Sequence, residues 1–272
     1  MSGFLDEMAR SSRARVALAK RREPQAMIEQ RAASAPPAPP LRLSAAGFDV
    51  IAEIKLRSPA AGRLLLAGDD WLGRACAYGR AGAAAVSVLT EPSQFDGSPL
   101  HLERAAAALA PLGVPAMCKD FLVDPYQLSQ ARALGAGGAL IILRMLSRAQ
   151  ASEMLDAACR HGLFVMLEAF DAAELAQAGE LAAQYHDRAH GVLIGLNCRD
   201  LQTLKVVPQR FFDLAGSLPP SSPVVAESGV AAPEEAAALR KLGYRLALVG
   251  SALMASEDPC RLIANILRAA RT

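Results

Sequence analysis

The sequence predicts an α/β fold, a (βα)8 TIM barrel that carries an N-terminal helical extension. Eight short apolar runs recur from residue 48 to the C-terminus, roughly 25–35 residues apart, which is the size and order of the strand–helix units of this barrel. Alanine-rich stretches with helical periodicity separate the runs. The runs lack a clean apolar–polar alternation, as expected of parallel strands that are buried on both faces. They span residues 49–54, 84–89, 114–118, 139–143, 163–167, 192–196, 223–226 and 246–249.

The part of the chain before residue 48 is expected to extend the barrel. Residues 3–22 are polar and helix-prone with sparse apolar positions, which predicts a helix on the protein surface. The proline-rich segment from Ala32 to Pro40 is incompatible with a helix or a central strand, so we interpret it as an extended linker. We therefore assign residues 1–47 to an extension that belongs to the same domain as the barrel of residues 48–272. We expect this extension to cover the barrel mouth, with residues 1–40 dispensable for the barrel core.

The helices between the apolar runs are expected to end at glycines. The stretch from Tyr126 to Gly135 follows the third run and is one such helix, closed by its glycine. Glycine is favoured there because the chain must adopt a left-handed conformation to leave the helix. The glycines that precede runs in this way are Gly82, Gly113, Gly135, Gly162, Gly191 and Gly243.

The composition argues against several classes of partner. Lys and Arg number 29 against 27 Asp and Glu, and the basic residues form no block longer than residues 20–22. Nucleic acid is therefore not expected as a partner, whereas a small anionic ligand is compatible with this balance. No apolar run approaches the length of a membrane span, and the N-terminus has acidic residues where a signal peptide is basic. We expect a monomer or a weak homodimer that does not associate with membranes.

The cysteines indicate a reducing compartment. They are odd in number, lie far apart and form no CxxC pair. This usage favours reduced thiols in the cytoplasm over a disulfide framework or a zinc site. The cysteines are Cys76, Cys118, Cys159, Cys198 and Cys260.

Polar side chains gather where the apolar runs end. Lys119 ends the third run, and a lone lysine there most often marks only the point where a strand meets water. In a barrel, however, the C-terminal ends of all strands share one rim, and that rim carries the active site. Structural ion pairs would explain one or two such groups, but not groups at this many strand ends. The polar groups at the strand ends are Glu53 and Lys55, Lys119, Glu168, Asn197 and Arg199, Glu227 and Ser228, and Ser251.

The protonation state of Lys119 stays open at this point. Burial at the end of an apolar strand lowers the pKa of a lysine, whereas carboxylates such as Glu53 and Glu168 on the same rim raise it. A lysine held as an ammonium near an apolar surface is suited to donate a proton.

Two glycine-containing turns predict a phosphate site. Gly229 and Gly250 follow the seventh and eighth runs, and each precedes the start of a helix. Backbone N–H groups at these two places form the usual phosphate site of the barrel. We expect both glycines to bind a phosphate with help from Ser251 and Ser58, and the loop of residues 58–62 to close over it. The chain has no P-loop, no GxGxxG fingerprint and no HExxH, so no cofactor and no metal is expected.

Several segments in the same order resemble indole-3-glycerol phosphate synthase. The resemblance runs from about residue 48 to the C-terminus and implies ring closure and decarboxylation of 1-(2-carboxyphenylamino)-1-deoxyribulose 5-phosphate, with release of carbon dioxide and water. This is a reaction of tryptophan biosynthesis. The matching segments are residues 51–55 with Ser58 and Pro59, residues 87–91 with 95–98, residues 118–121 with 124–127, and residues 194–201, 226–229 and 248–254.

The resemblance also implies roles for the rim residues. Lys119 matches the general acid of the family, and Lys55 matches the lysine that pairs with the substrate carboxylate and has been assigned acid roles in later steps. Glu168 matches the carboxylate that stabilises positive charge on the anilino nitrogen or removes a proton. The remaining matches are Glu53 and Glu227 as rim carboxylates, Asn197 as an orienting group, Arg199 and Ser58 as contacts to the substrate carboxylate and phosphate, and Pro59, Phe95, Phe121 and Leu140 as the apolar wall.

The chain also departs from the family pattern, which leaves alternatives. Glu168 is followed by Ala169 and Phe170 where many members have valine and histidine, and Arg144 stands where some members have lysine. The alternatives are a divergent paralogue in secondary metabolism, another phosphate-binding barrel such as a phosphoribosyl isomerase, and a barrel that survives as a binding protein. An isomerase would not need Lys55 and Lys119 together. The residues whose retention argues against a binding protein are Glu53, Lys55, Lys119, Glu168, Asn197, Glu227 and Ser228.

Overall fold

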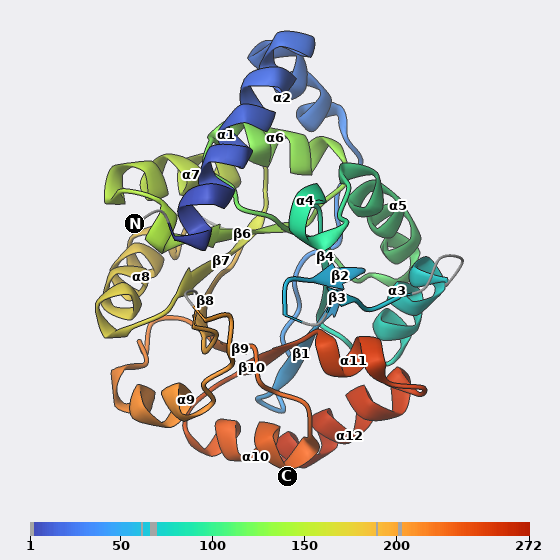
Figure 1. Cartoon of the computed structure of the whole chain (residues 1–272), viewed down its shortest axis with the longest axis vertical. Coiled ribbons are helices and arrows are strands. Elements are labelled where there is room, and N and C mark those ends of the chain that lie inside the picture. Colours follow the sequence, from blue (N-terminus) through green and yellow to red (C-terminus); the bar gives the residue numbers. More distant parts are fainter. Residues whose placement is uncertain (1–2, 61, 66–69, 189, 201–202) are drawn as a thin grey trace.

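The computed structural model describes residues 3–60, 62–65, 70–188, 190–200 and 203–272, and within these ranges it shows a closed barrel of eight parallel strands (Figure 1). Barrel strands that follow one another along the chain are hydrogen-bonded neighbours, and the last strand closes the barrel against the first. The predicted fold class is confirmed, and each of the eight apolar runs overlaps one strand of the barrel. The strands are β1 (Asp49–Ile54), β4 (Ala85–Leu89), β5 (Ala116–Lys119), β6 (Gly138–Ile142), β7 (Phe164–Ala169), β8 (Val192–Asn197), β9 (Val224–Glu227) and β10 (Leu246–Val249).

Helices surround the barrel, and local sequence sets where each one begins and ends. Several begin with proline directly after a capping residue; before α6, for example, the Asp124 side chain accepts a hydrogen bond from the backbone of Tyr126. The six glycines expected at helix ends all have positive φ, including Gly135 at +87°. The helices around the barrel are α3 (Trp71–Arg80), α5 (Pro99–Leu109), α6 (Pro125–Ala133), α7 (Arg148–Arg160), α8 (Ala172–Tyr185), α9 (Gln209–Asp213), α10 (Pro233–Lys241), α11 (Ser251–Ala255) and α12 (Pro259–Arg271), with the short α4 (Pro92–Phe95) after β4.

Two apolar cores hold this architecture. The larger core lies between the strands and the surrounding helices, and the smaller one fills the barrel interior with residues such as Met117 and Phe164. A Cβ at Gly138 would lie 2.3 Å from Cε1 of Phe164, so the glycine provides the space that the ring fills. Above these residues the interior opens toward the C-terminal rim, where the polar side chains lie.

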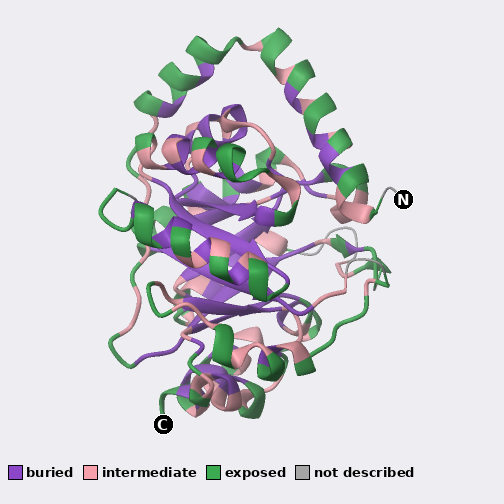
Figure 2. Ribbon diagram, turned by 90° about the vertical axis from the view of Figure 1, so that its left-hand side faces the viewer, coloured by how far each residue is buried: buried purple, intermediate pink, exposed green. Residues whose placement is uncertain are grey.

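The N-terminal extension consists of two helices that form an arch at one end of the molecule (Figure 2). Helix α1 (Phe4–Arg22) confirms the predicted surface helix, and α2 (Gln25–Ser34) follows it. The linker was predicted to begin at Ala32, which is wrong, because α2 continues to Ser34 and only the prolines from Pro36 onward exclude a helix.

The linker that follows is extended and is held by an arginine of the barrel. Nη2 of Arg132 on α6 donates to the carbonyl oxygens of Ala35 and Pro36 at 2.8 and 2.6 Å. These bonds satisfy backbone groups that have no partner in a helix or sheet. None of the helices in the described part of the chain is long and apolar enough to cross a bilayer.

Candidate active site

All the side chains and glycines predicted for the site line one cavity of about 360 Å³ at the C-terminal rim of the barrel. The strand ends supply the charged groups, and the loops that follow the strands supply the rest. The loop after β1 folds back as a small hairpin in which β2 (Arg57–Ser58) pairs with β3 (Gly62–Arg63), and it brings Ser58 and Pro59 to the cavity. Residue 61, which belongs to the predicted closing loop, lies outside the described residues.

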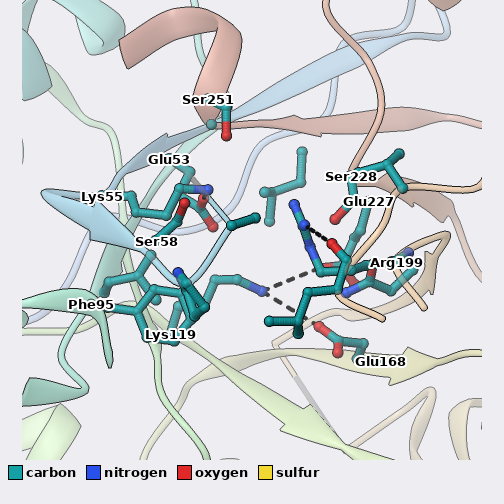
Figure 3. A pocket seen from close by; sticks show the side chains of 18 of the residues that line it. Glu53, Lys55, Ser58, Phe95, Lys119, Glu168, Arg199, Glu227, Ser228 and Ser251 are labelled. Carbon is teal, nitrogen blue, oxygen red and sulfur yellow. Dashed lines mark hydrogen bonds and ion pairs between the residues drawn. The ribbon is translucent and has the colours of Figure 1, made fainter. Parts of the chain in front are cut away.

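Lys119 lies at the centre of the charged groups, between the carboxylates of Glu168 on β7 and Glu227 on β9. Its Nζ is 3.4 Å from Oε2 of Glu168 and 3.3 Å from Oε2 of Glu227 (Figure 3). Burial lowers the pKa of Lys119, but the negative charges of Glu227, Glu168 and Glu53 outweigh burial and raise it above its ordinary value. The balance that the sequence left open therefore favours the ammonium form.

Glu227 is the most deeply buried carboxyl group of the site, with 1% of its surface exposed. Burial and the negative charge of Glu168 raise the pKa of Glu227 well above its ordinary value, although Lys119 opposes the shift. Gly195 on the adjacent strand makes room for this side chain, since a Cβ there would lie 2.0 Å from Oε1 of Glu227. The cluster thus places two carboxyl groups within reach of the Lys119 ammonium, and the pKa of the more deeply buried one, Glu227, is raised.

Glu53 and Lys55 form a second buried ion pair at the end of β1. Nζ of Lys55 donates to Oε1 of Glu53 at 2.8 Å. Burial raises the pKa of Glu53, but the positive charges of Lys55, Lys119 and Arg199 have the larger combined effect, so the pKa lies below its ordinary value. A Cβ at Gly250 would lie 2.3 Å from Oε1 of Glu53. A side chain at position 250 would therefore displace the Glu53 carboxylate from its ion pair with Lys55.

The two polar residues predicted after β8 make hydrogen bonds with described residues of the loop that follows the strand. Oδ1 of Asn197 accepts the backbone N–H of Arg199 at 2.9 Å, and Nη1 of Arg199 donates to the carbonyl oxygen of Leu204 at 2.6 Å. Arg210 on α9 donates to the carbonyl oxygen of Asn197 at 2.8 Å. These bonds hold the Arg199 side chain in the cavity wall.

The turn after β9 has an unusual backbone. Ser228 and Gly229 are consecutive residues with positive φ, at +66° and +89°. Such a conformation is uncommon for serine and is often found at functional sites. Ser251 begins α11 and lines the same cavity as this turn.

The apolar wall contains residues that the sequence did not reveal. Phe95 and Phe121 lie 6.1 Å apart between ring centroids, and the ring of Phe4 from α1 meets Phe121 edge-on at 5.7 Å. Phe4 and Leu5 were missed because only their sparse apolar character marked them, and no local pattern places the extension on the rim. Other lining residues not predicted are Ala60, Leu89, Asp120, Ile142, Leu204, Val206, Val230, Ala231, Leu248 and Ala252.

Arg144 follows β6 but does not line the cavity. Its guanidinium pairs with Asp171 and Glu174 and lies 4.7 Å from the ring centroid of Phe170. The two departures from the family pattern, at Arg144 and after Glu168, are therefore in contact with each other outside the site.

Comparisons with known proteins agree with this geometry. The family model for indole-3-glycerol phosphate synthase matches residues 5–266. The indole-3-glycerol phosphate synthase of Azospirillum brasilense is 39% identical, with 95% of this chain and 96% of that protein covered. The enzyme of the same name from Methanopyrus kandleri is 38% identical, over 85% of this chain and 87% of its own length.

Solved structures share the fold at much lower identity. A 3-hexulose-6-phosphate synthase from Salmonella typhimurium matches with a TM-score of 0.59 at 11% identity, over 82% of this chain and 98% of that one. A thiamine phosphate pyrophosphorylase from Pyrococcus furiosus matches with a TM-score of 0.56 at 15% identity, over 82% and 94%. These structures support the barrel, and the match to the family model together with the identities to the named relatives shows that the chain belongs to the indole-3-glycerol phosphate synthase family.

Proposed function

We propose that the protein is an indole-3-glycerol phosphate synthase, a carboxy-lyase of tryptophan biosynthesis. It converts 1-(2-carboxyphenylamino)-1-deoxy-D-ribulose 5-phosphate to indole-3-glycerol phosphate, carbon dioxide and water. The observation that supports this assignment most directly is the buried ammonium of Lys119 between Glu168 and Glu227 in a family member whose cavity is otherwise largely apolar. Ring closure needs such an arrangement, because a proton must reach a ketone oxygen while the aromatic part of the substrate lies against an apolar wall.

Lys119 serves as the proton donor in this proposal. A ring carbon of the substrate attacks the ketone carbon, and the ketone oxygen takes a proton from the ammonium as its double bond becomes a hydroxyl. The raised pKa of Lys119 ensures that the proton is present near neutral pH. Loss of the ring carboxylate as carbon dioxide then restores the aromatic ring. The hydroxyl takes a further proton, for which Lys55 is the proposed donor, and leaves as water, while the methylene carbon next to the nitrogen loses a proton to complete the indole.

Glu168 and Lys55 are proposed to support this sequence from opposite sides of the cavity (Figure 3). Glu168 stabilises positive charge that develops on the anilino nitrogen, since an ionised carboxylate stabilises a nearby cation most strongly in a buried site. Lys55 pairs with the substrate carboxylate, with Arg199 as a second cation that lines the same cavity. Glu53 holds Lys55 in place, and Asn197 holds the backbone of Arg199.

The phosphate is proposed to bind where Ser228, Gly229, Gly250 and Ser251 line the cavity, with Ser58 on the loop opposite. Ser251→Asp should raise KM about tenfold or more and leave kcat within a few-fold, because a carboxylate repels the phosphate in ground and transition states alike. Ser251→Asn, which has the same shape without the charge, is the control. An unchanged KM in Ser251→Asp would contradict the placement. Gly250 is a less selective test, because a side chain there would also displace Glu53.

One assay tests the function directly. Purified protein is mixed with the carboxyphenylamino-ribulose phosphate, and formation of the indole product is followed by fluorescence. Turnover confirms the assignment and excludes a barrel that only binds ligands. No turnover, together with isomerisation of a phosphoribosyl substrate, would favour the alternative enzyme class.

The compartment and the oligomeric state of the enzyme are also part of the proposal. We propose that it acts in the cytoplasm, without membranes or nucleic acid, as a monomer or a weak homodimer. The free thiols of the five cysteines are consistent with a reducing compartment. Light scattering on the purified protein tests the oligomeric state.

Deleting residues 1–40 tests whether the extension and the barrel form one domain. We expect a folded barrel with a lower melting temperature and weaker turnover. Phe4 and Leu5 leave the cavity, and Tyr126 loses the cover of Val16 and Ile28. The control is Phe4→Ala with Leu5→Ala, which keeps both helices and should reduce turnover with little change in melting temperature. An insoluble or unfolded truncation would show that the extension covers core.

A further inference from the structure

The carboxylate of Asp120, the residue after Lys119, is buried and accepts four hydrogen bonds. Its side chain is 4% exposed. Two bonds come from Nη1 and Nη2 of Arg15 at 2.9 and 2.7 Å, one from Oγ1 of Thr90 at 2.7 Å, and one from the backbone N–H of Phe121 at 2.7 Å. Asp120 therefore joins helix α1, the end of β4 and the end of β5 at the rim.

Arg15 brings the N-terminal extension into this network. Its two Nη atoms engage both oxygens of Asp120, the paired geometry that makes arginine–carboxylate contacts strong and directional. Burial lowers the pKa of Arg15, but the bond to Asp120 and its charge raise it overall. The same helix also contacts the start of α6 through Ser12, whose Oγ accepts a hydrogen bond from Nε2 of Gln127 at 3.0 Å.

The peptide between Lys119 and Phe121 is the part of the site that depends on Asp120. On one side Lys119 must keep its Nζ within reach of two carboxylates. On the other side Phe121 must present its ring between Phe4 and Phe95. Without Arg15 the buried carboxylate would lose its two charge-assisted bonds, and it would have to turn toward water to replace them. That turn would break the bond to the Phe121 N–H and move both neighbours.

We propose that Arg15 is a positioning residue for the proton donor: it fixes Asp120, and through Asp120 it fixes the strand end that presents Lys119 and Phe121 to the substrate. This inference rests on the proposed function, and it assigns to one residue of the extension a role in turnover that is separate from covering the cavity. Arg15 itself does not line the cavity.

The test compares Arg15→Met with Lys20→Met, both measured well below their melting temperatures. Arg15→Met should lower kcat by about 10–100-fold, because a small misplacement of a catalytic group is enough for such a loss. Lys20 is the matched control, since it lies on the same helix and pairs with Asp124 at 2.7 Å, but with side chains 40% and 30% exposed. An exposed pair of this kind contributes little, so Lys20→Met should behave like the parent.

Chemical rescue separates positioning from general stabilisation. In Arg15→Ala, assayed well below its melting temperature, millimolar methylguanidinium should restore kcat several-fold, and an equal concentration of sodium chloride should not. The site is accessible to a small cation, because the Arg15 side chain is 30% exposed. If Arg15→Met fails to fold, Asp120→Asn replaces it and should show the same fall in kcat.

Each outcome bears on one proposal. A parent protein without turnover contradicts the proposed function. An active parent with unchanged kcat in Arg15→Met or Asp120→Asn overturns the role of Arg15 alone. A fall in kcat that Lys20→Met matches, or that methylguanidinium does not relieve, also overturns it.

Discussion

Lys119→Met should lower turnover by ~10²–10⁴, the range that general acid catalysis typically contributes. Methionine keeps the length and the apolar stem of the side chain and removes only the ammonium. Nζ of Lys119 lies 3.3–3.4 Å from Glu227 and Glu168, and its raised pKa keeps the proton available. Removing it leaves the ketone oxygen without a donor, so the loss should be far larger in kcat than in binding.

Affinity provides the control for Lys119→Met. A substrate analogue with its ketone reduced to an alcohol cannot react, and its dissociation constant should change little in the variant. Lys241→Met, an exposed lysine on α10, should leave kcat and the melting temperature at parent values. Turnover of Lys119→Met within a few-fold of the parent would move the proton donor to Lys55.

Glu168→Gln should lower turnover about 100-fold or more, whereas Glu227→Gln should cost about tenfold at most. The two residues flank the same ammonium, but the proposed reaction uses only the carboxylate of Glu168. Burial and the charge of Glu168 raise the pKa of Glu227 well above its ordinary value. Glutamine at position 227 keeps the shape of the protonated form that this shift favours, whereas glutamine at position 168 removes the carboxylate that is proposed to stabilise charge on the anilino nitrogen.

The pH dependence of stability checks the raised pKa of Glu227. In the folded state Glu227 binds its proton up to a higher pH than in the unfolded chain, where its pKa is near the ordinary 4.5. The free energy of unfolding of the parent should therefore fall, relative to that of Glu227→Gln, as the pH rises from 4.5 through the raised pKa of Glu227. Urea unfolding of both proteins across this range measures the difference. Equal losses of turnover in the two glutamine variants would show that Glu227 acts as an ionised group.

The differences from the family pattern at Arg144 and after Glu168 show which features of single positions can be predicted from the sequence. Both were visible in the sequence as differences from the family, and both lie directly after strands that the apolar runs predicted. Their contact was not visible, because a cation over the ring of Phe170 depends on how two neighbouring loops pack. The same holds for Gly250, which the sequence linked to phosphate and the structure also links to Glu53.

The sequence by itself determined the barrel and the composition of its rim. Apolar runs with helical stretches between them specify parallel strands, and the parallel strands of a barrel all end on the same side. The side chains at these strand ends therefore lie close together, and Glu53, Lys119, Glu168 and Glu227 line one cavity. Only the tertiary structure decided the charge of Lys119, because a pKa follows from burial and from distances of a few ångströms between residues far apart in the chain. It also decided that α1 brings Phe4 and Arg15 to the rim, since contacts between a helix and loops more than a hundred residues away leave no periodic signal in the sequence.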